Sequence, residues 1–391
     1  MQGEQASGTQ DGPPLAGLLV LDLSQFLSGP YCALRLADLG ARVIKVERPD
    51  GGDLTRSLYL SDTEIGGDST LFHAINRGKE SLALDLKQPD DLAALRALIG
   101  RADVLIQNFR PGVIERLGLG YAAVRAINPR LVYAGISGYG TEGPWVGRPG
   151  QDLLAQARSG LMWLSGDADQ GPVPMGLAVA DMLAGATAAQ GILAALVRRG
   201  VTGRGGLVET SLLEVLIDLQ FEVLTTHLND GGRVPLRAAQ ASAHAYLSAP
   251  YGVYAASDGH LVIAMTPLGR LADLLGLPAL DLWRDDPASW FGARDAIKAV
   301  IAARIAQRTV ADWLALLEPA DIWCAKVLDW PALLASEGFA ALDMVQTVRR
   351  AGVALRTTRA PLRIDGVRPD CAAAAPQVGA DSAAIRAEFG I

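Results

Sequence analysis

The alternation of short apolar strands with helices in the first half of the chain constrains the fold most. Residues 18–23 are typical of a buried strand, Gly29-Pro30 opens a helix that Gly40 closes, and residues 42–47 form a second strand. Two strands joined by a helix in this way run parallel. The alternation continues with strands expected at 81–86, 103–107 and 131–136 and a helix at 90–99. We therefore expect an α/β fold with an open parallel sheet and helices on both faces.

The composition is that of a globular protein. Half of the residues are apolar and 20% are charged, while aromatic residues make up only 6% and there are 43 glycines. Few aromatics and many small residues favour helices packed closely on a sheet over a β-sandwich. The 35 Lys and Arg against 42 Asp and Glu give a net charge of -7. Nucleic-acid binders need a basic surface, so we expect no nucleic-acid partner.

Cysteine usage and the N-terminus bear on location. Cys32, Cys324 and Cys371 are far apart, odd in number and form no CxxC pair, which argues against a zinc site or a disulfide framework. A reducing cytoplasm fits this pattern. Residues 1–14 lack the basic and apolar regions of a signal peptide, and we expect them to be a disordered tail.

The longest apolar stretch, residues 177–197, has the length of a membrane span. It contains Asp181, Gln190 and many small residues, so we expect a buried core helix and no membrane partner. Further helices are expected at 152–164 and 179–199. A polar, loop-rich segment should follow at about 225–245, and a smaller α+β region after it. That region combines a hairpin with three helices, the strands at 251–256 and 260–265 and the helices at 268–275, 293–306 and 310–317.

Four loops follow strands of the predicted sheet, and ligands bind at such carboxyl ends. These loops are 25–30, 48–53, 108–112 and 137–143. Cations near them could hold phosphates, although exposed cations are more often only solvated surface. They are Arg48, Arg56, Arg77, Lys79, Arg110 and Arg116. The chain has no GxGxxG or Walker sequence, which disfavours an ordinary NAD or ATP site.

Three carboxylates attract attention as chemical groups. Asp167 and Asp169 share the turn Gly166–Pro172, where a carboxylate could attack an acyl group or simply hydrogen-bond the backbone. Asp181 lies in an apolar helix and is either a structural cap or a base. The four histidines have no metal-ligand spacing, so we expect no metal site.

Several segments together resemble the class III CoA-transferase family, which contains formyl-CoA transferase, carnitine CoA-transferase and α-methylacyl-CoA racemase. They are VLDLSQFLSGPYCALRLADLGARVIKVERPDGGD, INRGKESLALDLK, ADVLIQNFRPGVIERLGLGY, NPRLVYAGISGYGTEGP, SGDADQGPVPMGLAVADMLAG and TGRGGLVETSLLE. They occur in family order from about residue 15 to 215, and APYGVYAASDGHLVIAM extends the match to about 265. The combination is highly specific, although no single fragment is.

The resemblance implies a fold built from both chain ends. A large Rossmann-like, CoA-binding domain would take residues 15–220 and the returning segment 326–391, with a small α+β domain at 221–325 between them. It also implies an interlocked homodimer.

The resemblance also implies roles for single residues. Asp169, twelve residues before Asp181, would be the nucleophile, with Asp167 as a nearby rival. Here Gln170-Gly171-Pro172 stands where the family has Gly-Pro-Pro. The implied CoA contacts are Gln25, Phe26, Leu27, Ser28, Arg48, Ile75, Asn76, Lys79, Asn108, Phe109, Arg116, Ser137, Gly138, Tyr139 and Gly140.

Departures from the family pattern indicate which of the family's reactions and substrates to expect. Gln151 stands where the racemases need a His, and Gln cannot shuttle a proton. Leu27 stands where oxalate enzymes have Gln, and the small domain lacks their glycine-rich loop. Ser137 stands where some relatives have Lys, so one cationic contact to CoA is missing. The first two differences argue against oxalate and formate. We therefore expect a transferase that moves CoA from a donor such as succinyl-CoA to an organic acid other than oxalate or formate. No cofactor beyond the CoA thioester is implied.

Two alternatives stay open, a 2-methylacyl-CoA racemase or isomerase that uses Asp181, and a non-catalytic CoA-binding homologue. Candidates for holding the carboxylate of the acceptor acid are Arg148, Arg204, Arg237, His244 and His260.

Overall fold

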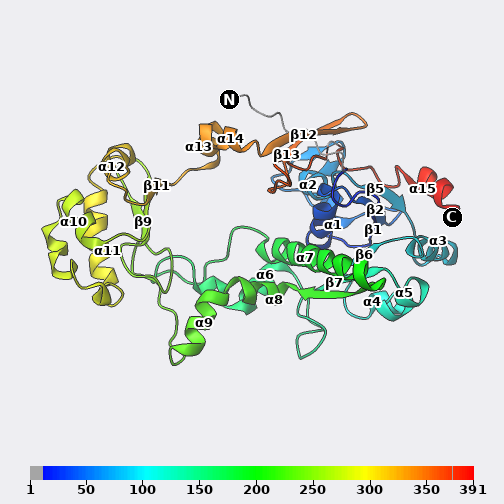
Figure 1. Cartoon of the computed structure of the whole chain (residues 1–391), viewed down its shortest axis with the longest axis horizontal. Helices are drawn as coiled ribbons and strands as arrows, with labels where there is room; N and C mark the ends of the chain where they lie inside the picture. The colour runs from blue at the N-terminus through cyan, green and yellow to red at the C-terminus, as the bar shows by residue number, and fades with distance from the viewer. Residues whose placement is uncertain (1–11, 372) are drawn as a thin grey trace. The chain divides into compact units, whose positions relative to one another are not determined.

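The computed structural model describes residues 12–371 and 373–391 and divides into two compact units (Figure 1). Unit 1 takes the chain up to Ala155, Ala178–Leu216 and Ala341–Ile391. Unit 2 takes Gln156–Leu177 and Ile217–Ala340. Most of the tail expected at residues 1–14 lies outside the described residues.

Unit 1 is built on a six-stranded parallel sheet. Its strands are β1 (Leu19–Asp22), β2 (Arg42–Glu47), β5 (Glu80–Ala83), β6 (Val104–Gln107), β7 (Val132–Ser137) and β8 (Gly206–Ser211). The strand order is β5-β2-β1-β6-β7-β8, and each neighbouring pair is parallel. β1 is buried along its whole length, as expected for a parallel sheet covered on both faces. The predicted open parallel sheet is confirmed.

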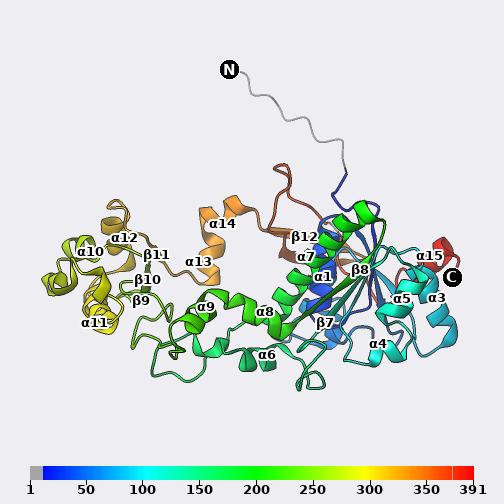
Figure 2. The same cartoon turned by 60° about the horizontal axis from the view of Figure 1, so that its bottom comes forward.

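Helices α1 (Ser28–Asp38) and α7 (Val179–Thr202) cover one face of the sheet, and Figure 2 shows them side by side. Gly185 allows this close approach, because a Cβ there would lie 2.5 Å from the Ser28 carbonyl oxygen. Helix α7 is long and apolar enough to cross a membrane by length and composition alone. Here it packs on α1, β7 and β8 through Ala184, Ala188 and Ile192. It is therefore a core helix of unit 1, as the small residues in its sequence predict.

The opposite face of the sheet carries α3 (Pro89–Ile99), α5 (Tyr121–Ile127) and α15 (Ser382–Phe389) (Figure 2). Leu95, Leu98 and Ile385 pack there with Leu21 and Leu105 in one apolar cluster. The C-terminal helix thus joins the core begun by the first strand. Arg350, far along the chain, donates to the Lys79 carbonyl at 2.7 Å and pairs with Asp381 at 2.6 Å, which fixes the returning segment.

The smaller elements of unit 1 complete its surface. They are a short helix η1 (Leu54–Ser57), the two-residue pair β3 (Glu64–Ile65) and β4 (Asp68–Ser69), α2 (Thr70–Asn76), α4 (Val113–Arg116) and the hairpin β12 (Val345–Arg350) with β13 (Val353–Thr358). The chain passes from unit 1 to unit 2 within α6 (Asp152–Ser159) and returns to unit 1 just before α7. It enters unit 2 again within α8 (Leu212–Leu219) and returns within α14 (Glu337–Leu342).

Unit 2 has a three-stranded antiparallel sheet packed on helices. Its strands are β9 (Gly252–Ala255), β10 (His260–Ile263) and β11 (Cys324–Lys326), in the order β11-β10-β9. Its helices are η2 (Leu161–Trp163), α9 (Phe221–Asn229), α10 (Leu268–Leu275), η3 (Pro278–Trp283), η4 (Pro287–Ser289), α11 (Arg294–Ile305), α12 (Val310–Leu317) and α13 (Trp330–Ala335). The fully buried Trp313 packs with Ile297, Ile301 and Leu271 at its centre.

Two local predictions are wrong. The helix expected over 152–164 ends at Ser159, because Gly160 adopts a positive φ of 84° and starts a separate short helix. The segment expected to be loop from about residue 225 begins inside α9, which extends to Asn229. The unit bounds also differ from the predicted domain boundaries, since Gln156–Leu177 and residues 326–340 group with unit 2.

Candidate active site

The strand order of unit 1 places a topological switch point between β1 and β6. From β1 the chain builds outward through β2 and β5, and from β6 it builds the other way through β7 and β8. Ligands of open α/β sheets bind beyond the carboxyl ends of the two strands that flank such a point. Gln25–Ser28 follow β1, and Asn108 and Phe109 follow β6. Topology alone therefore selects two of the predicted CoA loops.

Asn108 binds these two loops together. Its Oδ1 accepts from the Gln25 backbone N–H at 2.8 Å, and its Nδ2 donates to the Gln25 carbonyl at 2.7 Å. The same Nδ2 lies 3.4 Å from the Ser28 Oγ. Phe26, at the tip of this loop, has a φ of 62°, and half of its side chain is exposed. The bonds hold Phe26 outward from the sheet edge, while Leu27 is half-buried behind it.

The loop after β7 is closed by its own side chains. Ser137 Oγ accepts from the Gly140 N–H at 2.9 Å, and the Tyr139 hydroxyl donates to the Pro149 carbonyl at 3.1 Å. The Gly138 carbonyl accepts from the Leu213 N–H at 3.2 Å. The predicted residues Ser137–Gly140 thus form a fixed turn at the same edge of the sheet as Asn108.

A buried network of charged groups, Asp22, Lys45, Asp53 and Lys79, supports the end of β1. Lys79 Nζ donates to Asp22 Oδ2 at 2.8 Å, to the Pro30 carbonyl at 2.9 Å and to Asn76 Oδ1 at 2.8 Å. Lys45 Nζ lies 2.7 Å from Asp53 Oδ2. Burial favours the neutral form of Asp22, but the ammonium groups of Lys79 and Lys45 outweigh it and hold its pKa below the ordinary value. Burial lowers the pKa of Lys79 to about 8.

This network places three predicted CoA residues inside the protein. Ile75, Asn76 and Lys79 are all buried, and the three bonds of Lys79 use every N–H of its ammonium group. In this structure Lys79 joins Asp22 at the end of β1 to Pro30 in α1, and Asn76 accepts its third bond.

The cations considered for phosphate binding separate into two kinds. Arg56 is buried and bound to Glu47 and Asp68, both at 2.7 Å, and Arg77 is buried against Asp38. Arg48 follows β2 and Arg116 ends α4, and both are exposed. The exposed pair lies at the surface, whereas each member of the buried pair is bound to carboxylates.

Asp181 lies in the first turn of α7. Asp152 Oδ1 accepts from the backbone N–H groups of Ala180 at 2.7 Å and Asp181 at 3.2 Å, so Asp152 caps the helix. Burial, with the charge of Asp152, raises the pKa of Asp181 to about 7, although a hydrogen bond from Ser28 opposes the shift. Asp181 can therefore exchange a proton near neutral pH.

The loop Ser165–Gly171 in unit 2 carries the two candidate nucleophiles, and the structure distinguishes them. Asp167 Oδ1 accepts from the Ser242 backbone N–H at 2.9 Å, so this carboxylate anchors the loop. The Asp169 side chain is exposed and makes no hydrogen bond or ion pair with any described residue. Of the two carboxylates, Asp169 is therefore the one without a partner among the described residues.

The same loop is closed by two side chains. Gly166 has a φ of 81°, which favours glycine, and Gln170 Oε1 accepts from the Asp167 N–H at 2.8 Å across the turn. Gln170 stands at the first departure from the family sequence, and its amide oxygen closes the turn. Buried Arg237 donates to the carbonyls of Ser165 at 2.6 Å, Gly171 at 3.1 Å and Gln170.

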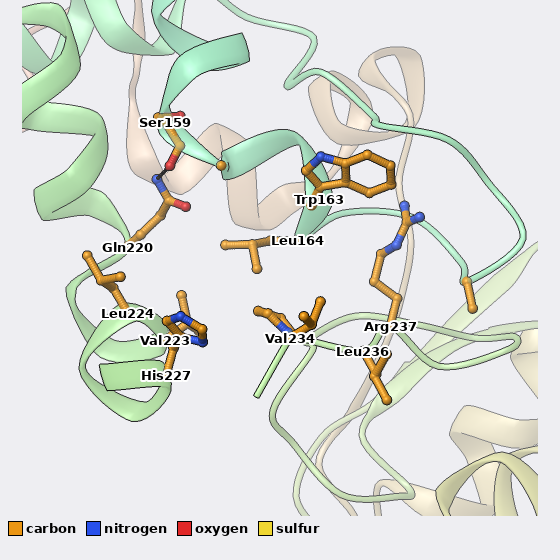
Figure 3. A pocket seen from close by; sticks show the side chains of 13 residues that line it. Ser159, Trp163, Leu164, Gln220, Val223, Leu224, His227, Val234, Leu236 and Arg237 are labelled. Carbon is orange, nitrogen blue, oxygen red and sulfur yellow. Dashed lines mark hydrogen bonds between the residues drawn. The ribbon is translucent and has the colours of Figure 1, made fainter. Parts of the chain in front are cut away.

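A pocket of about 580 Å³ opens beside this loop within unit 2 (Figure 3). Its walls are mainly apolar, and Ala168, the neighbour of Asp169, is part of them. The guanidinium of Arg237 lies 5.7 Å from the ring centre of Trp163. Figure 3 shows these two side chains next to each other. The principal apolar walls are Trp163, Leu164, Val223, Leu224, Val234 and Leu236. Such walls suit the hydrocarbon part of a small organic ligand.

Sequence reasoning missed this pocket and the loop-binding role of Arg237. Helix α9 supplies Val223, Leu224 and His227 from one side, and its apolar residues three and four apart were the available signal. No group of three or more His, Cys, Asp or Glu that could hold a metal occurs among the described residues.

The chain is similar in sequence to a known protein family and to several of its members. The model of CoA-transferase family III matches residues 15–382. The chain is 35% identical to acetyl-CoA:oxalate CoA-transferase of Acetobacter aceti, over 96% of each chain. It is 38% identical to succinyl-CoA:mesaconate CoA-transferase of Haloarcula hispanica, over 78% of this chain and 76% of that protein.

A solved structure agrees with the fold. The crystal structure of a CAIB/BAIF family protein from Brucella suis superposes with a TM-score of 0.83 at 32% identity. The match covers 97% of this chain and 100% of the other.

Proposed function

The chain belongs to CoA-transferase family III and is an enzyme that moves CoA from an acyl-CoA to a carboxylic acid. We propose that Asp169 is the nucleophile that carries first the acyl group and then CoA during the transfer. The observation that supports this role most directly is the free, exposed carboxylate of Asp169 on a loop whose backbone is otherwise bound. A carboxylate without a partner keeps its full nucleophilicity, whereas that of Asp167 is engaged in a hydrogen bond.

The proposed reaction runs through two kinds of acyl-enzyme. An Asp169 oxygen attacks the thioester carbon of the donor, the C–S bond breaks, and CoA leaves as a thiolate with an aspartyl anhydride behind it. The thiolate then attacks the Asp169 carbonyl of that anhydride and releases the donor acid. The acceptor carboxylate attacks the carbonyl of the resulting aspartyl-CoA thioester, the C–S bond breaks, and an anhydride between Asp169 and the acceptor forms with CoA thiolate released. The thiolate then attacks the acceptor carbonyl of this anhydride, which gives the acceptor acyl-CoA. Asp169 is regenerated, and no other reactant is consumed.

Unit 1 would hold CoA in this proposal. The loops at Gln25–Ser28, Asn108–Phe109 and Ser137–Gly140 all follow strands at the carboxyl edge of the sheet. Arg48, exposed at the same edge, would pair with a phosphate of CoA. Backbone N–H groups near Ser137–Gly140 would stabilise the oxyanion that forms on the attacked carbonyl.

The proposal also covers the identity of the donor and acceptor acids. We propose succinyl-CoA as donor and a C4–C6 or larger organic acid as acceptor. The apolar pocket beside the Asp169 loop supports an acid with a hydrocarbon body. The similarity to a protein named acetyl-CoA:oxalate CoA-transferase makes oxalate a necessary member of any acid panel, although Leu27 departs from the oxalate pattern.

Three further properties belong to the same proposal. The energy of one thioester passes to the next, so the reaction needs no metal, ATP or resident cofactor. We propose an interlocked homodimer, which light scattering on the purified protein would test. Cys32, Cys324 and Cys371 are free thiols, which supports a cytoplasmic location.

Intact-protein mass spectrometry tests the nucleophile. Wild type and Asp169→Ala are mixed with succinyl-CoA, quenched and trapped with hydroxylamine or borohydride. The proposal expects an adduct on wild type that maps to the peptide with Asp169 and is absent from the variant. An adduct that persists on Asp169→Ala would transfer the role to another residue, and Asp167→Ala would then be tested in the same way.

A further inference from the structure

The segment 236–245, here called the strap segment, is hydrogen-bonded both to helix α11 and to the loop that carries Asp169. It has no regular secondary structure, yet its backbone is bound from both sides. Leu236 is exposed, while Arg237 and Ala238 directly after it are buried. An irregular segment whose backbone is so fully bonded acts as a fixed support.

On one side the strap segment binds the Asp169 loop. The Ala238 carbonyl accepts from the Ala168 N–H at 2.9 Å, and the Ser242 N–H donates to Asp167 Oδ1 at 2.9 Å. Arg237 adds its bonds to the carbonyls of Ser165, Gln170 and Gly171. The bonds of Arg237 fall before and after Asp169, so one guanidinium closes the loop across its mouth.

On the other side α11 binds the strap segment. Buried Arg294 donates to the carbonyls of Ala245 at 2.8 Å and Leu236, and buried Lys298 donates to the Ala241 carbonyl at 3.0 Å. Asp295 Oδ1 accepts from the Ala239 N–H at 2.9 Å. Helix α11 therefore fixes the strap segment at four points, and the strap segment fixes the loop.

Arg237 is suited to this task by geometry. A planar guanidinium presents five N–H donors in fixed directions, so it can bind several carbonyls at once, whereas the single nitrogen of a lysine cannot span them. Among the described residues Arg237 has no ion pair, and its bonds to Ser165, Gln170 and Gly171 are all to backbone oxygens. Arg237 thus binds the backbone of the loop and does not pair with the carboxylate of Asp169.

We propose that Arg237 is a positioning residue for the nucleophile, which it serves by holding the backbone on both sides of Asp169 in the reactive arrangement. This inference rests on the proposed role of Asp169. It also replaces the expectation that Arg237 binds the carboxylate of the acceptor acid. Because small displacements of a reacting group cost about 10²-fold in rate, loss of the clamp should act on the chemical step.

The test compares Arg237→Gln and Arg237→Lys with wild type in single-turnover formation of the Asp169 adduct from succinyl-CoA. We expect about 100-fold slower formation for Arg237→Gln and a smaller loss for Arg237→Lys, with the KM for succinyl-CoA changed less than about threefold. Arg233→Ala removes an exposed arginine four residues away and should keep the wild-type rate. Guanidinium ion at millimolar concentration should partly restore Arg237→Ala, and urea should not.

A second measurement does not depend on the chemistry. Hydrogen exchange of peptides that cover residues 165–173 should be faster in Arg237→Gln than in wild type, while peptides from α11 stay protected. If wild type forms no adduct but exchange in the loop is still faster in Arg237→Gln, the proposed function is wrong. The role of Arg237 in holding the loop backbone is then still supported.

If exchange in the loop is unchanged, or if adduct formation keeps its wild-type rate, the positioning role is wrong. Should Arg237→Gln fail to fold, Arg237→Lys carries both readouts. A KM that rises for the acceptor acid alone, with the single-turnover rate intact, would instead make Arg237 a substrate ligand.

Discussion

The two units use buried charge in opposite ways. Beneath the β1 loop of unit 1, Lys45 and Lys79 meet Asp22 and Asp53, and each cation has a carboxylate within 2.8 Å. Beside the Asp169 loop of unit 2, Arg237 and Lys298 are also buried but bind backbone carbonyls, with no ion pair among the described residues. In unit 1 each buried cation is paired with an anion, whereas in unit 2 the two buried cations are hydrogen-bonded only to neutral carbonyl groups.

This difference separates support from reactivity. Buried ion pairs are costly to break, because removal of one partner leaves the other charge unpaired, so the unit 1 network holds its loop rigidly. Cations bound to carbonyls fix a backbone without occupying a carboxylate, so Asp169 stays available. Substitutions in the two arrangements should separate these two roles.

The largest effect is expected from Asp169→Asn, which removes the free carboxylate of unit 2. The variant should lose about 10⁴-fold or more in transfer rate, since the covalent route is closed. The measurement is CoA transfer from succinyl-CoA to an acid panel that includes oxalate. Asp167→Asn is the matched control, because its amide oxygen can still accept from Ser242, and it should lose less than about tenfold. Equal losses in the two variants would contradict the distinction.

The next effect is expected from Lys79→Met in the unit 1 network. This variant leaves Asp22 charged and buried, and should lower the free energy of unfolding by about 3–5 kcal/mol in urea titrations. Adding Asp22→Asn should recover part of the loss, and exposed Lys87→Met should change stability by less than about 0.5 kcal/mol. A stable Lys79→Met protein with a raised KM for succinyl-CoA would show instead that Lys79 contacts CoA.

A pH-dependent effect is expected from Asp181→Asn. The folded-state pKa of Asp181, about 7, lies above the ordinary 3.8, so ionising it costs stability as the pH rises through that interval. The variant should match wild type near pH 4 and exceed it increasingly up to pH 7, by at most about 4 kcal/mol. Chemical denaturation across pH measures this. Asp152→Asn keeps the helix cap but removes the repelling charge, and should reduce the pH dependence only in part, because burial is the larger cause of the shift. Equal stability of Asp181→Asn and wild type across this pH range would refute the shifted pKa.

The smallest effect is expected from Arg48→Ala at the carboxyl edge of the sheet. Loss of one exposed phosphate contact should raise the KM for succinyl-CoA about threefold to tenfold, and high salt should shrink the difference. Arg101→Ala is the control, since Arg101 is exposed but precedes β6 at the other end of the strand. The same change in both variants would indicate a general charge effect and no bound phosphate.

The strands and their loops could be predicted because their causes are local. Residues 42–47 form β2 with the predicted bounds, and 268–275 and 310–317 form α10 and α12 as expected. The helix expected to run to residue 164 ends five residues earlier, because Gly160 adopts a positive φ just past the helix, a stop that apolar periodicity does not register.

The site was predictable only in part. The loops after β1, β6 and β7 follow from strand order, and the resemblance to a known family selected Asp169. The burial of Lys79 and Arg77 could not be foreseen, because a lysine or arginine in sequence looks the same whether it faces water or a carboxylate from a distant strand.

The sequence by itself determined the parallel sheet, the loops at its edge and the two acidic candidates in one turn, because periodicity and turn residues act over a few positions. Only the tertiary structure decided which aspartate is free and what holds its loop. The bonds that settle this join residues 66 to 75 positions apart, between Arg237 or Ser242 and the loop at 165–171. Such contacts depend on how the chain closes in space, and local sequence carries no record of that.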